Sequence, residues 1–183
     1  MKKLLSLFAV LGGLLIAAPS FAQIAVTRVT LTPYGGETSI ASSGTKSYGI
    51  KFNVKYPVYV TGVSMVRLTG DSVFHTWRIT KLDGTVLLQN AVGPSLTTSW
   101  VGGAITLLQP GQDYVFSMSY TSGSTTVPKH NGITPLPYSS PSGAFTVVTG
   151  LYENSSVLVP TIPTTTVYGF DLFAYPALFG VYQ

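Results

Sequence analysis

The chain contains no cysteine, so it has no disulfide bond, no thiolate metal centre and no site for a lipid on an N-terminal cysteine. Charged side chains are also scarce, at 9% of the residues against about 25% in a typical domain. The formal net charge of +4 is too small for the basic surface that nucleic acid or a membrane requires. A surface so poor in charge must consist of Thr, Ser, Gly, Asn and Tyr, which suits extracellular packing, glycan contact or assembly.

The N-terminal segment has the pattern of a secretory signal peptide. Two lysines precede an uncharged apolar run over residues 4–18, and Ser20 and Ala22 supply small side chains before the expected cleavage site. The run is short for a membrane anchor, which needs about 20 residues. We therefore expect a cleaved signal peptide, residues 1–22, and one mature domain, residues 23–183. The mature chain is expected to have no membrane span and to be secreted, periplasmic or at the cell surface.

Strand patterns recur along the mature chain, and no segment has a convincing helical period. Glycine and proline interrupt the chain about every ten residues, which is typical of an all-β sandwich or barrel. We predict a single antiparallel β-sandwich of about eight to ten strands. Besides a hairpin, strands are expected at residues 24–31, 48–54, 59–68, 100–107, 114–120, 145–152 and 167–175, and loops at 32–44, 121–143 and 154–166.

The segment 75–89 is predicted to be a β-hairpin around which the other strands are laid. Asp83-Gly84 is a dipeptide that readily occupies both centres of a two-residue turn. Because side chains alternate in a strand, that turn predicts one apolar face. The expected cross-strand pairs are Leu82–Thr85, Lys81–Val86, Ile79–Leu88 and Trp77–Asn90, and the expected core face is Trp77, Ile79, Val86 and Leu88.

Several short motifs follow one another in a recognisable order between residues 47 and 175. They are Gly49-Ile50-Lys51-Phe52, Val60-Thr61-Gly62-Val63, Asp83-Gly84-Thr85-Val86-Leu87, Leu108-Gln109-Pro110-Gly111-Gln112-Asp113-Tyr114 and Tyr168-Gly169-Phe170-Asp171. This series resembles a family of bacterial extracellular β-sandwich domains of unassigned function. The resemblance implies a jelly-roll-like fold found beside glycan-handling modules and in surface proteins. It implies no catalytic residues, because the family has none agreed.

No residue set has the spacing of a catalytic or metal site. The six acids include no closely spaced pair such as a glycosidase could place in one cleft. Asp83 and Asp113 are interpreted as turn residues. His75 and His130 are far apart, and the nucleophile motif Gly-x-Ser-x-Gly is missing. We therefore predict no enzymatic activity and no cofactor; a structural Ca²⁺ held by loop carboxylates and carbonyls remains compatible with the sequence.

The candidate ligand-binding residues are aromatic and polar side chains in or near expected loops. Aromatic rings beside polar groups form surfaces on which sugar rings stack, although each ring alone could equally pin a loop onto the sandwich. The longest expected loop, residues 121–143, is the predicted working surface. The candidates are Lys129, His130, Asn131, Tyr138, Tyr34, Tyr56 and Trp100.

Three functions are compatible with this pattern. The leading hypothesis is a secreted, non-catalytic β-sandwich that binds glycan or matrix polymer at the cell surface. The alternative is a structural subunit of a surface fibre, because the strand at residues 24–31 or the apolar C-terminal tail could pair with the sheet edge of another copy. A small outer-membrane β-barrel ranks third, since prolines are frequent in the last third of the chain.

Overall fold

The computed structural model describes residues 27–30, 38–66, 74–93, 98–120, 124–131, 136–140, 143–168 and 170–176. The predicted signal peptide lies outside these residues. Within them the protein is all-β. No helix is present there, and so none that is long and apolar enough to cross a membrane. The strands are β1 (Thr27–Thr30), β2 (Thr38–Ser43), β3 (Lys46–Val54), β4 (Val58–Val66), β5 (His75–Lys81), β6 (Val86–Val92), β7 (Thr98–Leu108), β8 (Asp113–Tyr120), β9 (Ser124–Asn131), β10 (Tyr138–Ser139), β11 (Phe145–Glu153), β12 (Ile162–Thr164), β13 (Thr166–Tyr168) and β14 (Asp171–Pro176).

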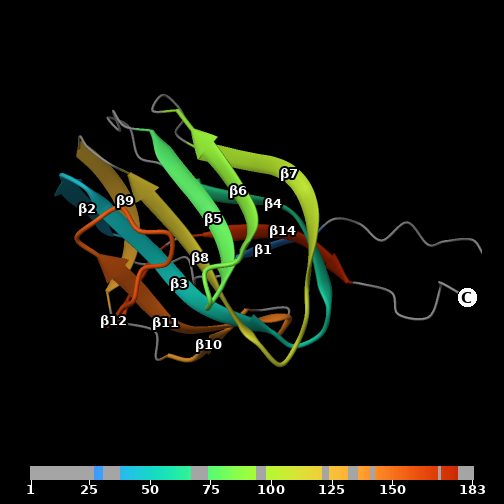
Figure 1. Ribbon diagram of the computed structural model, residues 1–183. Helices are drawn as coiled ribbons and strands as arrows, with labels where there is room; N and C mark the ends of the chain where they lie inside the picture. The colour runs from blue at the N-terminus through green and yellow to red at the C-terminus, as the bar shows by residue number, and fades with distance from the viewer. Residues whose placement is uncertain are drawn as a thin grey trace, which may run out of the picture.

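Eight of these strands form a jelly-roll sandwich, in which every pairing is antiparallel. The first sheet has the order β1-β14-β4-β7, and the second sheet contains β3-β8-β5-β6. If these eight strands are numbered 1 to 8 along the chain, the order in the first sheet is 1-8-3-6. The order in the second sheet is 2-7-4-5. This alternation between two sheets is the double Greek key of a jelly roll. The predicted sandwich fold is therefore confirmed (Figure 1).

The remaining described strands are additions to that frame. The second sheet is lengthened beyond β3 by β11 and β10, and β12 pairs with β11. A third, smaller sheet has the order β13-β9-β2. The additions come from two stretches of chain, one between β1 and β3 and the other between β8 and β14. They raise the described strands to fourteen, above the eight to ten expected.

One apolar core fills the space between the two main sheets. Phe116 of β8 and Phe170, just before β14, meet with ring centroids 4.2 Å apart. Phe52 of β3 contacts Tyr114 of β8 and Phe145 of β11, with centroids at 5.8 and 6.2 Å. All five rings are essentially inaccessible to solvent. Aromatic side chains of the second sheet therefore contribute much of this core, together with Val60, Leu108 and Leu172 of the first sheet.

The predicted hairpin exists as β5 and β6, and its inner half has the predicted register. Ile79 pairs with Leu88 and Trp77 pairs with Asn90. The register then shifts, because Thr80 pairs with Val86 and leaves one additional residue in β6. Trp77, Ile79 and Leu88 are buried as predicted, but Val86 is 43% exposed. The bulge turns Val86 away from the core, so its predicted core position and its pairing with Lys81 are wrong.

The turn itself explains this bulge. The Gly84 amide donates to the Lys81 carbonyl at 3.1 Å, so Leu82 and Asp83 are the central residues of the turn. Gly84 follows them with φ of +87°, and no described non-glycine residue has positive φ. This is a three-residue loop closed by a left-handed glycine, so Lys81 lies opposite Thr85 and the predicted pair Leu82–Thr85 is wrong. Next to this loop the pairing is one position out of step with the two-residue turn that was expected, and the additional residue Leu87 restores the expected register at Ile79–Leu88. The Thr85 amide donates to Asp83 Oδ1 at 2.8 Å, which holds the pKa of that carboxyl below its ordinary value.

All three expected loops contain strands. Residues 32–44 include β2, residues 121–143 include β9 and β10, and residues 154–166 include β12 and the first residue of β13, so the expectation of long structureless connections there is wrong. β2 and β9 pair with each other over six residues of each, including Pro128 opposite Ser39. Their sequences are mostly Thr, Ser, Lys and Asn, which carry no apolar alternation, and a proline argues against a strand. Likewise, the single strand expected at 167–175 is divided between β13 and β14, which belong to different sheets.

A segment that we call the strap, residues 154–161, crosses the outer face of the second sheet. Figure 1 shows it as the orange-red loop that passes in front of β3 near β12. The Val157 amide donates to Ser47 Oγ at 2.9 Å, and Ser117 Oγ donates to the Leu158 carbonyl at 3.2 Å. These bonds attach the strap to β3 and β8 and explain why both serines are buried although they face away from the core.

We expect Trp77→Ala to lower the free energy of unfolding by about 3–5 kcal/mol, because a buried indole leaves a large cavity. Val86→Ala, in the same hairpin, should cost less than about 0.5 kcal/mol because the side chain is exposed. Urea denaturation followed by fluorescence and circular dichroism measures both. Equal effects of the two substitutions would show that the bulge is misplaced.

Gly150→Ala should prevent the close approach of β11 to the chain around Thr166. A Cβ added at Gly150 would lie 1.9 Å from the Thr166 carbonyl oxygen, which is backbone and cannot rotate away. The expected loss of stability is at least about 3 kcal/mol, the upper part of the range for overpacking. Gly93→Ala is the control, since its Cβ would lie 3.5 Å from a Phe74 ring atom, an ordinary contact. Similar melting temperatures for both variants would contradict this packing.

Candidate functional site

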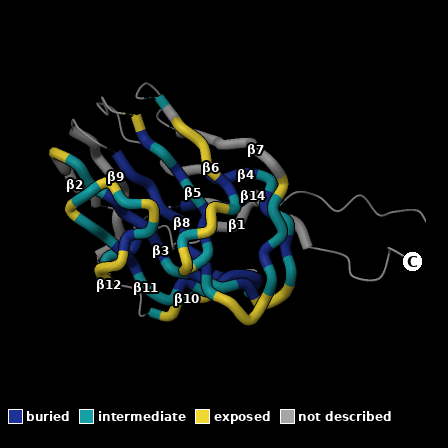
Figure 2. The backbone as a smooth tube through the Cα atoms, viewed as in Figure 1, coloured by how far each residue is buried: buried dark blue, intermediate teal, exposed yellow. Residues whose placement is uncertain are grey.

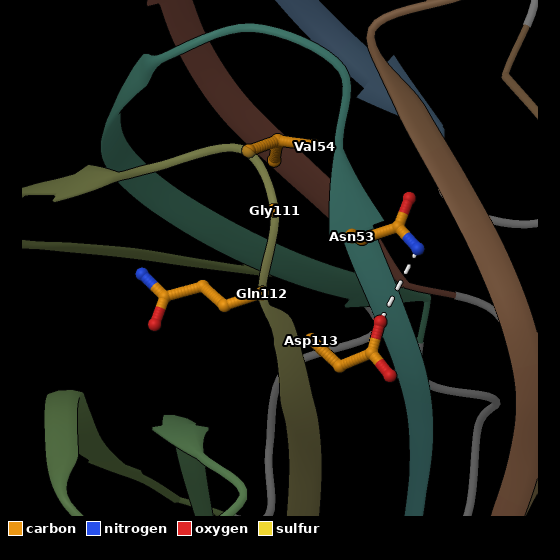
Figure 3. Close-up of a pocket in the computed structure, with 5 residues that line it drawn as sticks. All are labelled: Asn53, Val54, Gly111, Gln112 and Asp113. Atoms are coloured by element: carbon orange, nitrogen blue, oxygen red, sulfur yellow. Dashed lines mark hydrogen bonds between the residues drawn. The ribbon is translucent and has the colours of Figure 1, made fainter.

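An open pocket of about 420 Å³ lies where β3 ends and β8 begins. It is lined by Asn53, Val54, Gly111, Gln112 and Asp113. Figure 3 shows that these residues come from the end of β3, from the turn between β7 and β8 and from the first position of β8. We call this the turn-end pocket. Its lining side chains are mainly amides and a carboxylate, which distinguishes it from the apolar interior.

Strand alternation and register bring the polar groups together. Phe52 and Val54 point into the core, so Asn53 between them faces outward. Tyr114 likewise points inward, and Asp113 before it faces outward. Because Asn53 pairs directly with Asp113, the two side chains are neighbours on the outer face of the second sheet.

The Tyr114 hydroxyl fixes the turn that forms one wall of the pocket. It accepts from the Gln109 amide at 2.7 Å and from Gln112 Nε2, and it donates to the Gln109 carbonyl at 3.1 Å. Gly111 has φ of +83°, a conformation that glycine adopts at no steric cost. The turn is thus tied to a ring that is itself buried in the core.

Asp113 is the only carboxylate that lines the turn-end pocket. Its Oδ1 accepts from Asn53 Nδ2 at 3.2 Å, the bond drawn in Figure 3. Its Oδ2 lies 3.6 Å from Lys51 Nζ, with both side chains 30% exposed. An ion pair at this exposure contributes little to stability. Its effect here is to orient the carboxylate while leaving acceptor positions open to solvent.

This set of groups suits a ligand rich in hydroxyl groups. A carboxamide offers two donors and an acceptor, and an ionised carboxylate offers only acceptors. Asn53 and Asp113, held side by side at the rim of the pocket, can bond neighbouring hydroxyls that each donate and accept, whereas the Gln112 side chain points away from them (Figure 3). The described residues contain no group of three or more His, Cys, Asp or Glu side chains arranged to hold a metal ion. The structural Ca²⁺ stays a prediction.

Two of the sequence-predicted site residues have described side chains. Tyr56 lies in the connection between β3 and β4, two residues after the pocket residue Val54, and is 38% exposed. In the same connection the Lys55 amide donates to the Ala144 carbonyl at 2.9 Å. Tyr138 lies in β10 opposite Val147, is half-buried and packs against the core. Tyr56 is thus near the turn-end pocket along the chain, and Tyr138 has a structural role in addition to any in binding.

The other predicted residues lie elsewhere. Lys129, His130 and Asn131 form the end of β9 and pair with β13 instead of standing in a free loop. Trp100 lies in β7 opposite Ser64, in the first sheet. The side chains of these four residues and the whole of Tyr34 lie outside the described part of the structure. No described contact joins the third sheet, β7 and the turn-end pocket into one site.

Asn53, Gln112 and Asp113 are not among the site residues predicted from the sequence. Asp113 was interpreted as part of the Pro110-Gly111 turn, but it is the first residue of β8. The alternation of residues 48–54 and 114–120 already indicated which side chains face outward. The missing information was the pairing of β3 with β8, which are far apart in the chain.

Neither a scan against protein-family models nor a search of curated proteins finds a match to this chain. The resemblance to bacterial extracellular β-sandwich domains therefore stays a prediction.

Tyr114→Phe should release the turn that walls the pocket while leaving the core packing unchanged. The loss of the hydroxyl removes its bonds to Gln109 and Gln112, at a cost of about 1–3 kcal/mol in the free energy of unfolding. Hydrogen exchange should speed up at the Gln109 amide and not at amides in the middle of β8. Tyr48→Phe, at a ring in the same core, is the control; unchanged exchange at Gln109 would contradict the role of the hydroxyl.

Proposed function

We propose that this protein is a non-catalytic, exported β-sandwich that binds glycan at the cell surface. The observation that carries the proposal is the turn-end pocket, in which Asn53 and Asp113 present side chains fixed by a hydrogen bond, and Gln112 adds a carboxamide that points away from them. Binding through such groups requires no nucleophile, metal or cofactor. The scarcity of charge in the whole chain suits contact with a hydroxyl-rich polymer.

The frame of the pocket supports binding with little conformational change. Its strands are joined by the register of β3 and β8, and its turn is tied to the buried Tyr114. A rigid site loses little conformational entropy when a ligand binds, which favours affinity for a weakly interacting hydroxylated chain. The exposed ring of Tyr56, in the adjoining turn, offers an apolar surface of the kind on which a sugar ring stacks.

A second candidate function is self-assembly through sheet edges. Within the described residues β1 has a partner on one side only, since it pairs with β14 at the edge of the first sheet. An edge strand with unpaired backbone groups is a site for strand addition from another chain. Assembly of this kind and glycan binding at the turn-end pocket use different surfaces.

Asn53→Ala and Gln112→Ala should each weaken glycan binding about fivefold, because one lost hydrogen bond corresponds to about 1 kcal/mol. Asn90→Ala is the matched control, since it removes an exposed carboxamide from β6, away from the pocket. A glycan array identifies the ligand, and titration calorimetry measures the affinity of each variant.

The melting temperature of Asn53→Ala and of the control should stay close to that of the original protein, because both side chains lie outside the core. Equal binding by all variants would place the site elsewhere and make the exposed Tyr56 the next residue to test. If no glycan binds and electron microscopy shows fibres, the edge-strand function replaces this one.

A further inference from the structure

The outer face of the second sheet carries a second polar cluster, centred on Arg78 of β5. Arg78 pairs with Ser117 of β8 on one side and with Gln89 of β6 on the other. It alternates with the buried Trp77 and Ile79, so its side chain lies on the face opposite the core. The strap is attached to β3 and β8 on this face, through Ser47 and Ser117.

β5 and β6 are more accessible than the strands beneath the strap. Figure 2 shows β8 in dark blue along most of its length, whereas β6 is largely yellow. Leu158, whose carbonyl accepts from Ser117, is 39% exposed. Arg78 therefore lies beside the attachment point of the strap, with an exposed strand on its other side.

The guanidinium of Arg78 is held by two neutral side chains. Nε donates to Gln89 Oε1 at 2.8 Å, and Nη1 donates to Ser119 Oγ at 2.7 Å. These bonds use two of the five N–H donors that a guanidinium carries. They orient the planar group on the sheet and leave donors for a further acceptor. Burial lowers the pKa of Arg78 below its ordinary value, yet an arginine stays charged at neutral pH.

No described carboxylate neutralises this cation. Asp113 pairs with Lys51, the Asp83 carboxylate accepts from the Thr85 amide in the hairpin turn, and the Glu153 carboxylate accepts from Thr161 at the end of the strap. The described residues thus place a half-buried, oriented positive charge among neutral partners. Removing a charge from water without a counter-charge is costly, so an external anion would gain from this position.

We propose that Arg78 binds an oxyanion, a carboxylate or a sulfate, carried by the glycan, so that the protein recognises acidic polysaccharide. This inference rests on the proposed glycan-binding function and names the class of its ligand. The fork of guanidinium donors matches the paired oxygens of both groups, and a charged acceptor strengthens each hydrogen bond. Gln89 and Ser119 act as positioning residues that hold the fork in place.

The two clusters lie on the same face of the second sheet, so one extended chain that passes over the strap could contact both. Asp113 of the turn-end pocket and Ser117, the partner of Arg78, lie four residues apart on the same face of β8. At about 3.3 Å per residue, this corresponds to about 13 Å along the strand. Neutral hydroxyl groups would bind at the pocket, and an acidic group further along the polymer would bind at Arg78.

The test uses a panel of uronate-containing and sulfated polysaccharides, each with its carboxyl-reduced or desulfated counterpart. The mature domain should bind the acidic member of a pair more tightly than the neutral member, and the difference should shrink as salt rises. Arg78→Gln should weaken binding of the acidic member by about tenfold or more and leave that of the neutral member unchanged. Comparing the uronate-containing polysaccharides with the sulfated ones shows whether Arg78 binds a carboxylate or a sulfate.

Two control variants separate recognition from general charge. Arg78→Lys keeps the charge but loses the planar fork, so it should bind the acidic member less tightly than the original protein. Lys81→Gln removes a positive charge from the same strand and should change the affinity by less than about twofold, because a single charge in contact with solvent and without a bound ligand group is screened by salt. Thermal melting of each variant shows whether the fold is intact.

The inference is overturned if Arg78→Gln binds the acidic member as well as the original protein does. It is also overturned if Lys81→Gln reduces binding equally, or if an acidic peptide such as polyglutamate binds as tightly through Arg78 as the glycan does. If glycans bind through Asn53 and Gln112 but the acidic members of the panel bind no more tightly than the neutral ones, this inference is wrong and the proposed function still holds. No binding across the whole panel would remove both.

Discussion

The structure depends on β8, which is paired on both sides and buried on both faces. It lies between β3 and β5, and from Tyr114 to Tyr120 none of its residues is more than slightly exposed. Its inward side chains are large and fill the core, whereas Ser117 and Ser119 on the outer face are small. Small hydroxyl side chains allow the strap to approach and Arg78 to lie across the strand, and each hydroxyl finds a hydrogen-bond partner there. A larger side chain at either serine would separate these layers.

The same strand, β8, also holds the turn-end pocket in place. Tyr114 lies at the start of β8, where its ring packs against Phe52 in the core and its hydroxyl holds the turn that precedes the strand. One side chain therefore connects the packing of the sandwich to the wall of the site. The outward neighbour, Asp113, takes its place in the pocket from the register with Asn53. Binding groups placed in this way move only if the strand pairing itself moves.

Elements with apolar alternation could be predicted, and polar elements could not. The strands around Ile50, Phe116 and Val147 have one apolar face, because a sheet face that packs on a core must exclude water there. β2 and β9 pair through their backbones and contain mostly polar residues, so their sequence has the composition of a loop. The hairpin shows an intermediate case. Its existence follows from Asp83-Gly84 between two apolar runs, but the bulge that turns Val86 outward depends on which residues are central in the turn.

The sequence by itself determined the all-β class, the absence of disulfides and the inward faces of the best-patterned strands, because these follow from composition and from the two-residue period of a strand. Only the tertiary structure decided which strands are neighbours. Pairing between β3 and β8 joins residues about sixty positions apart, and no local rule of turn or period specifies such a partner. Asn53 meets Asp113 because β3 pairs with β8, and Arg78 meets Ser119 because β5 pairs with β8. The candidate sites could not be predicted from the sequence, because their residues become neighbours only when the strands pair in the sheet.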